Sequence, residues 1–166
     1  MLNIKEDDKM KEEKLGLAGW VEINHNDSKG NLIQRIVTPN CLTNTGFAEV
    51  AGLICLDQLS GRTAFDYIAI GIGTTAATAT DTTLVSEITD VGGQRGVAAG
   101  TRVNTNVTND TMQLVLTYTF TGTRAVTESG VLNASSAGIM LCRQTFSAIN
   151  VVSGDSLEVT WKVAVA

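Results

Sequence analysis

Two stretches in the second half of the chain alternate apolar and polar side chains over most of their length. In "TMQLVLTYTFTG" (111–122) and in "DSLEVTWKVAV" (155–165), every second residue is apolar. Successive side chains of a β-strand point to opposite faces, so this alternation predicts two strands with one buried and one exposed face. Such strands need partner strands and a second layer over the buried face, which favours a mainly β fold.

The composition supports the same fold class. About one residue in eight is threonine, and the 166 residues include 16 glycines and a single proline. Threonine is β-branched and favours strands and turns over helix interiors. A chain of this length can bury one hydrophobic core without disulfides. We therefore expect one β-sandwich domain over residues 15–166, preceded by a charged arm at residues 1–14.

Further apolar segments follow one another at spacings of about 10–15 residues, with polar turns between them, as in sandwiches and jelly rolls. Residues 84–88 fit one helical turn or a short strand. The pattern predicts a single β-sandwich or jelly-roll-like domain with one short α-helix and an extended N-terminal arm. The other expected strands are 15–24 and 32–37 as one hairpin, 67–73, a segment near 98–107, and 125–133 and 138–146 as a second hairpin.

One segment, residues 43–61, has the period of a helix. Its apolar residues recur at intervals of about 3.6 residues. Thr43 or Asn44 can cap the first turn, and Gly61 can end the helix. The recurring apolar positions are Phe47, Val50, Ala51 and Ile54.

The charge of the chain argues against several classes of partner. A net charge of −5 disfavours nucleic acid, because the neutralisation of phosphates needs a basic face. Residues 1–14 lack the apolar core of a secretory signal, and no apolar run approaches the roughly 20 residues of a membrane span. We expect no membrane partner and folding in a cytoplasm. The Asn-x-Ser/Thr triplets then carry little weight as glycosylation sites; they start at Asn26, Asn106, Asn109 and Asn133.

The stretch "FDYIAIGIGTTAATATDTTLVSEI" (65–88) raises the question of a phosphate site. Phosphate-binding turns follow the patterns G-x-x-x-x-G-K-[ST] or G-x-G-x-x-G, and a helix begins there. After Gly71-Ile72-Gly73 there is no third glycine, no lysine before Lys162 and no helical period. We therefore interpret the turn as the end of a strand, and we expect an extended loop at residues 74–83.

Acidic residues in the same region are candidates for a metal site. Asp81 and Glu87 could form a carboxylate pair with Asp66 or Asp90 nearby, but they lack the alternate spacing of a calcium loop. Asp81 is more consistent with an Asx turn or a cap, and Glu87 with a buried partner for an arginine. No metal ligand is assigned.

Residues that could take part in catalysis are also few. The single histidine, His25, lies in the turn-rich stretch 25–31 and is expected to be exposed, so a Cys41–His25 pair has little support. No serine lies in a nucleophile-elbow motif. Glu128 is expected to bind a backbone amide or an arginine such as Arg143, which is a structural role. No catalytic or cofactor-binding residue is assigned. Cys41, Cys55 and Cys142 are interpreted as small buried hydrophobic residues.

Three segments, taken in order, resemble structural proteins of tailed-bacteriophage virions, including tail-collar fibre proteins and small virion surface proteins. The shared motifs are Asn-x-Leu-Thr-Asn-x-Gly (40–46), Tyr-x-Ala-x-Gly-x-Gly-Thr (67–74), Leu-x-x-Glu (84–87) and Thr-Glu-x-Gly (127–130), with a final aromatic-containing strand. The tail-collar type usually places an arginine soon after Leu-x-x-Glu, whereas the nearest basic residue here is Arg95.

The resemblance implies a non-enzymatic virion protein without a cofactor, assembled in a host cytoplasm. It fits a head decoration (cement) protein, expected as a homotrimer on the major capsid protein, or a tail, fibre or baseplate subunit. The small size and the charged arm, which can order on a neighbouring subunit, favour decoration. A third hypothesis is a glycan-binding module, although the aromatic residues lie mostly on predicted core faces; they are Trp20, Trp161, Tyr67, Tyr118 and four Phe.

Overall fold

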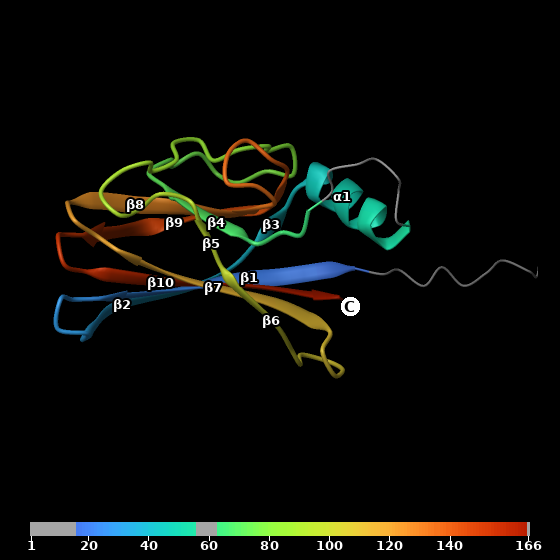
Figure 1. Cartoon of the computed structure of the whole chain (residues 1–166), viewed down its shortest axis with the longest axis horizontal. Helices are drawn as coiled ribbons and strands as arrows, with labels where there is room; N and C mark the ends of the chain where they lie inside the picture. The colour runs from blue at the N-terminus through green and yellow to red at the C-terminus, as the bar shows by residue number, and fades with distance from the viewer. Residues whose placement is uncertain (1–15, 56–62, 166) are drawn as a thin grey trace, which may run out of the picture.

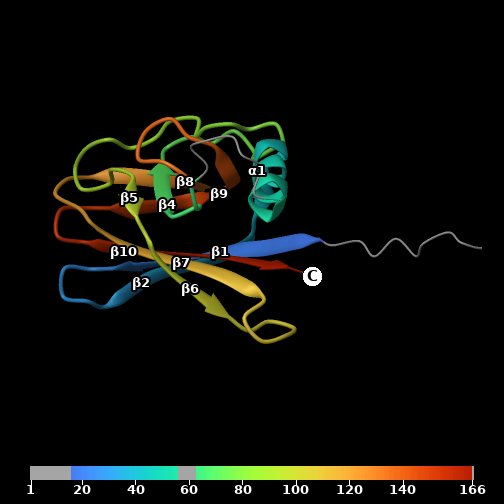
Figure 2. The same cartoon turned by 45° about the vertical axis from the view of Figure 1, so that its right-hand side comes forward.

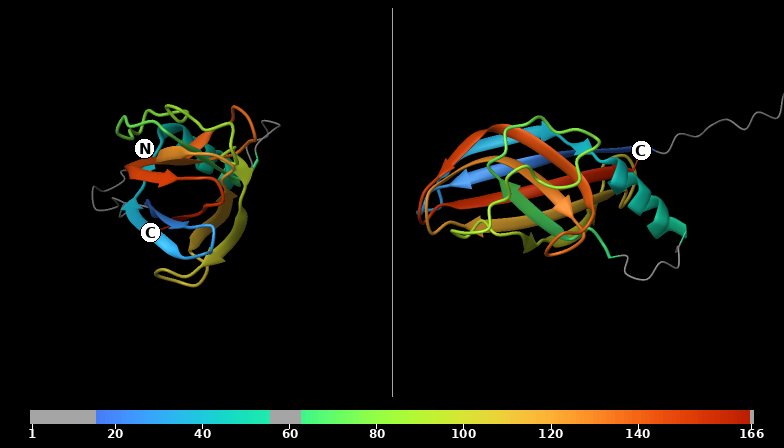
Figure 3. Two further views of the ribbon diagram at one scale, coloured as in Figure 1. Left: turned by 90° about the vertical axis from the view of Figure 1, so that its left-hand side faces the viewer. Right: turned by 90° about the horizontal axis from the view of Figure 1, so that it is seen from above.

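In the computed structural model, which describes residues 16–55 and 63–165, two five-stranded antiparallel sheets pack face to face as a β-sandwich (Figures 1 and 3). The first sheet has the strand order β2-β1-β10-β7-β6, and the second sheet has the order β3-β9-β8-β4-β5. The strands are β1 (Leu17–Asn26), β2 (Leu32–Pro39), β3 (Cys41–Leu42), β4 (Tyr67–Gly71), β5 (Gly96–Val97), β6 (Ala99–Val103), β7 (Thr111–Thr119), β8 (Arg124–Leu132), β9 (Met140–Val151) and β10 (Ser156–Val165).

The two alternating stretches form the centre of the first sheet, as the sequence predicts. Strands β7 and β10 pair in one continuous register, with Leu114 opposite Trp161 and Leu116 opposite Val159. Val159 and Trp161 are fully buried between the sheets. The period-2 pattern therefore identified both the strands and the face that each one buries.

Both predicted hairpins are confirmed. Strands β1 and β2 pair around a turn in which the Asp27 carboxylate accepts the amides of Lys29 and Asn31, at 2.8 and 2.9 Å. Gly30 completes this turn with φ of 85°, a conformation that favours glycine. Strands β8 and β9 form the second hairpin in the other sheet.

Polar bonds cross the core and tie the two sheets together. The indole Nε1 of Trp161 in the first sheet donates to Ser129 Oγ in the second sheet at 3.0 Å. The Tyr118 hydroxyl donates to the carbonyl of Ile68 across the same interface at 2.8 Å. These bonds satisfy polar atoms that burial would otherwise leave unpaired, and they fix the position of one sheet on the other.

Helix α1 (Asn44–Cys55) lies at one end of the sandwich (Figures 1 and 2). Thr43 caps it, because its Oγ1 accepts the amide of Gly46 at 3.0 Å. The predicted apolar face is wrong in part, since Phe47 is 46% exposed while Gly46 and Gly52 are buried. Gly46 determines the orientation of the helix, because only a residue without a side chain fits there. A Cβ on Gly46 would lie 2.6 Å from the carbonyl oxygen of Leu141 in β9. The predicted end at Gly61 lies outside the described residues.

A long segment covers the outer face of the second sheet. Residues 72–95, which we call the covering segment, run across β4 and β8 without regular structure apart from one bridge between Gly71 and Glu87 (Figure 3). The loop expected at residues 74–83 is confirmed. Leu84 anchors the segment, because it packs on Ala69, Leu132 and Met140 in a second apolar cluster.

Two predicted strands are too long. The strand expected at residues 67–73 is β4, which ends at Gly71. The segment expected near 98–107 is strand β6, which ends at Val103. The Asp110 carboxylate accepts the amides of Thr105, Asn106 and Val107 at 2.7–2.8 Å, so these residues turn instead of extending the strand. The charged arm expected at residues 1–14 lies outside the described residues.

Candidate functional site

Among the buried carboxylates of the described residues, that of Glu128, on the fully buried part of β8, accepts the most hydrogen bonds. Its Oε1 accepts the amides of Gly73 and Ser86, at 3.0 and 2.7 Å. Its Oε2 accepts the amide of Val85 at 3.1 Å and Nε of Arg143 at 2.8 Å. A buried carboxylate is stable only with such partners, and Glu128 has them on both oxygens.

Arg143 on β9 extends this cluster to the loop above the sheet. Its side chain is fully buried, and it donates through Nη1 to Asp81 at 2.7 Å and through Nη2 to the carbonyl of Thr75 at 2.9 Å. Burial alone would raise the pKa of Asp81, but the bonds from Thr78 and Arg143 lower that pKa overall. We call Glu128, Arg143 and Asp81 the Glu128 cluster.

The Glu128 cluster explains the glycine-rich turn. A Cβ on Gly73 would lie 2.4 Å from Glu128 Oε1, and one on Gly71 would lie 2.5 Å from the same atom. Amides on this turn and in the covering segment do hold an anion, as a phosphate loop does, but the anion is the protein's own carboxylate. The site is therefore already occupied, and the predicted structural role of Glu128 beside Arg143 is confirmed.

The structure separates the acids that were weighed as metal ligands. Asp81 belongs to the Glu128 cluster, and Glu87 pairs with Arg95 at 2.6 Å, as expected of a partner for an arginine. Asp90 pairs with Arg124. In the part of the chain that the structure describes, no three His, Cys, Asp or Glu residues come close enough to hold a metal ion.

His25 is not exposed, so that prediction is wrong. Strand β1 continues to Asn26, which keeps His25 in the inward-facing series of Val21 and Ile23. The residue is 2% exposed, and its Nε2 lies 2.8 Å from the carboxylate of Asp155, a buried residue of the turn before β10. Sequence analysis missed Asp155, and only the long-range pairing of β1 with β10 brings the two residues together.

Two of the three cysteine side chains, Cys41 and Cys142, lie in the described part of the structure. The thiols of Cys41 and Cys142 are free. Cys142 is buried, as expected, and burial raises the pKa of its thiol. Cys41 is only half-buried, and it does not meet His25, which pairs with Asp155. The side chain of Cys55 lies outside the described part of the structure.

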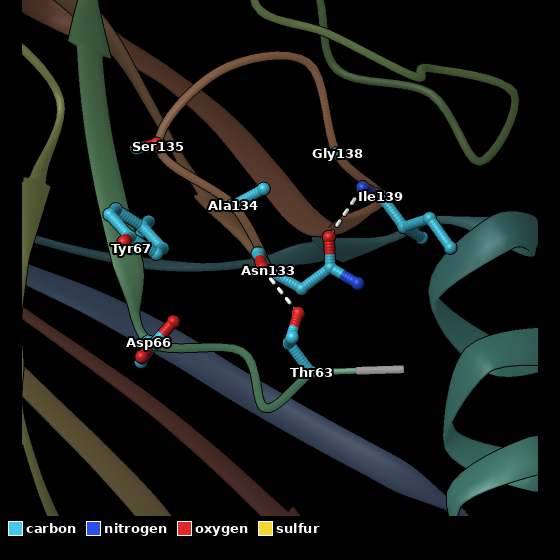
Figure 4. A pocket seen from close by; sticks show the side chains of 8 residues that line it. All are labelled: Thr63, Asp66, Tyr67, Asn133, Ala134, Ser135, Gly138 and Ile139. Atoms are coloured by element: carbon cyan, nitrogen blue, oxygen red, sulfur yellow. Dashed lines mark hydrogen bonds between the residues drawn. The ribbon is translucent and has the colours of Figure 1, made fainter. Parts of the chain in front are cut away.

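A cavity of about 500 Å³ opens beside the turn between β8 and β9 (Figure 4). Tyr67 and Asp66, at the start of β4, form one side, and Asn133 with Ser135 forms the other. Asn133 Oδ1 accepts the amide of Ile139 at 2.7 Å, which fixes the orientation of the side-chain amide. No motif in the sequence indicated this pocket, because Asp66 and Asn133 are far apart in the chain.

No described segment covers the outer face of the first sheet (Figures 1 and 3). We call it the bare face. Val37 on β2, 55% exposed, is one of its apolar residues. Arg35 and Glu22 form an ion pair there at 2.9 Å, and Lys162 lies 5.7 Å from the centre of the Trp20 ring. The remaining outward positions of the central strands are mainly polar: Gln113, Thr117, Thr119, Glu158 and Thr160.

Comparisons of the chain with protein-family models, with curated proteins and with solved structures find no match. No helix among the described residues has the length and apolar character needed to cross a membrane. Functional assignment therefore depends on the geometry of the chain and on the order of its motifs.

Proposed function

We propose that this chain is a non-enzymatic structural protein of a tailed-phage virion, and that it decorates the outer surface of the head. The observation that carries the proposal is the use of the motif residues. Gly71, Gly73, Leu84 and Glu128 hold the covering segment on the second sheet. Motif residues that all build the scaffold favour a protein that acts through its surfaces.

The first motif supports the same interpretation. The Thr43 hydroxyl caps helix α1 and donates to the carbonyl of Met140, while the Asn44 amide donates to Ala79 in the covering segment at 2.8 Å. The motifs at residues 40–46, 67–74, 84–87 and 127–130 are thus joined around the second sheet. Arg95, which follows Leu-x-x-Glu later than in tail-collar proteins, still reaches Glu87.

The bare face is the surface through which we propose that the chain binds the capsid. A broad sheet face that mixes threonine, valine and tryptophan with a few charges suits a stable contact with a protein lattice. The homotrimer and the contact with the major capsid protein are parts of this proposal. A tail, fibre or baseplate position is the alternative, and its partner would be a tail subunit.

Immunogold labelling of purified particles of the encoding phage tests the position. Label over the head supports decoration, label confined to the tail supports the alternative, and particles without the protein would refute both. Binding of the purified chain to undecorated heads then tests the bare face. We expect Val37→Lys to lower the affinity about tenfold or more, because the charge is buried at the contact.

Val97→Lys is the matched control for this binding experiment. Val97 on β5 is 59% exposed, which is similar to the 55% exposure of Val37, but Val97 lies at an edge of the second sheet. Equal losses of affinity for the two variants would remove the bare face from the proposal. Circular dichroism of both variants should match that of the unaltered chain, since both positions are exposed.

A further inference from the structure

The cavity beside the β8–β9 turn has a rigid wall. Arg95 Nη1 donates to the carbonyls of Ala134 and Ala137, at 2.9 Å each, and its guanidinium is held by Glu87. Thr63 Oγ1 donates to the carbonyl of Asn133 at 2.6 Å. The turn is therefore fixed from several sides before any ligand arrives, which lowers the entropic cost of binding.

Asn133 presents an unused donor to the cavity. Asn133 is only 7% exposed, and its Oδ1 accepts a hydrogen bond from the amide of Ile139. Its Nδ2 donates to no described residue, and Asn133 lines the cavity (Figure 4). A fixed amide with a free NH₂ group can donate to an acceptor oxygen of a ligand.

Asp66 supplies the complementary group. Its carboxylate accepts no hydrogen bond and meets no cation within ion-pair distance among the described residues, although its main-chain oxygen accepts the amide of Ala98. Tyr67 follows it directly, packs by one side on the cluster around Leu84, and lines the cavity. Asn133, Asp66 and Tyr67 thus line the same cavity (Figure 4).

We infer that this cavity, which we call the Asn133 pocket, binds a neutral saccharide. One sugar hydroxyl can accept from Asn133 Nδ2, another can donate to Asp66, and the apolar C–H face of the ring can lie on Tyr67. A volume of about 500 Å³ accommodates one or two sugar rings. Acidic sugars are disfavoured by the Asp66 charge, and a simple ammonium ion offers no acceptor to Asn133.

The Asn133 pocket is lined by residues of the second sheet and its β8–β9 turn, whereas the bare face belongs to the first sheet, so a chain bound through the bare face keeps the pocket open. The sugar site therefore adds a second contact to the proposed virion protein and does not depend on it. Val37→Lys should leave sugar binding unchanged, which separates a failure of one proposal from a failure of the other.

The experiment is a titration of the ¹⁵N-labelled full chain with neutral methyl glycosides of glucose, galactose, mannose and N-acetylglucosamine, to about 50 mM. This range detects dissociation constants up to about 10 mM. We expect at least one glycoside to shift the amides of Tyr67, Ala134 and Ser135, and we expect N-acetylneuraminic acid and methylammonium to leave them unshifted. No response to any glycoside, or a response to methylammonium alone, overturns the inference.

Two isosteric variants test the recognition itself. Asn133→Asp keeps the oxygen that accepts from Ile139 but removes the free donor, and Asp66→Asn removes the charge. Each should weaken glycoside binding about tenfold or more, because a site built for a hydroxyl group loses most when a partner is missing. Glu158→Gln, a carboxylate on the bare face, is the control. Equal affinities of all three variants and the unaltered chain overturn the inference, as do shifts that map outside the pocket.

Discussion

The two sheets have five strands each, but their outer faces are built differently. On the first sheet the outer face is bare, and alternation alone supplies the polar side chains that meet water. On the second sheet the covering segment lies over β4 and β8, and its irregular backbone has amides that strand pairing does not satisfy. The Glu128 cluster binds three of those amides.

This difference shows where charge is needed inside the molecule. An irregular segment that covers a sheet must find partners for its buried backbone groups, and a carboxylate can accept several of them at once. Glu128 in turn needs a cation, which Arg143 provides from the neighbouring strand. On the bare face the charges of Glu22 and Arg35 lie at the surface, where they are paired with each other and are not needed to bind buried backbone amides.

The largest expected effect comes from Glu128→Gln. The substitution leaves the guanidinium of Arg143 without its buried counter-charge and turns an NH₂ group toward backbone donors. We expect the free energy of unfolding to fall by about 3–5 kcal/mol, measured by urea denaturation. Hydrogen exchange at the amides of Val85 and Ser86 should accelerate more than exchange in the first sheet.

Glu158→Gln on the bare face is the matched control for that experiment. It makes the same chemical change on an outward-facing position of β10, and the expected change in stability is within about 0.5 kcal/mol. If the two variants lose equal stability, the contrast between the two outer faces is wrong.

A smaller effect is expected from Gly73→Ala. The new methyl group would meet Glu128 Oε1 at 2.4 Å and Val85 Cβ at 2.7 Å, so the covering segment must shift. We expect a loss of about 1–3 kcal/mol in thermal or urea unfolding. Gly100→Ala on β6 is the comparison, because the nearest atom there is Leu114 Cδ2 at 3.4 Å. A Gly73→Ala protein as stable as the Gly100→Ala protein would contradict the close fit of the turn.

The smallest effect concerns pH. The lowered pKa of Asp81 means that its carboxylate stabilises the folded chain fully above the unfolded pKa of about 4, and that this contribution is lost as pH falls through the folded value. Asp81→Asn should cost on the order of 1 kcal/mol at pH 7, since the side chain is partly exposed, and less at pH 3. Urea unfolding at both values measures the difference.

The exposed pair on the bare face provides the comparison for Asp81. The side-chain bond from Arg35 lowers the pKa of Glu22, but the Arg35 side chain is 57% exposed, so water screens the pair. Glu22→Gln should therefore change stability less than Asp81→Asn at pH 7. A larger or more pH-dependent loss for Glu22→Gln would show that the bare face carries the more important charges.

Local patterns in the sequence determined much of the fold. The alternation at 111–122 and 155–165 identified two central strands and their buried faces, and the turn formers before Leu32 identified the first hairpin. Thr43 was correctly predicted as a possible cap. These features depend on neighbours within a few residues, so the chain records them directly.

Tertiary structure decided most of the polar contacts. The sequence suggested Arg143 as a partner of Glu128, but the three amides that complete the cluster, the Asp155 partner of His25 and the shared pocket of Asp66 and Asn133 come from distant segments. Such contacts depend on strand order and on the path of an irregular segment, and neither leaves a periodic signal. The same reason explains why the buried face of helix α1 differs from the face that the apolar pattern predicts. The close approach of Gly46 to β9 determines which face is buried.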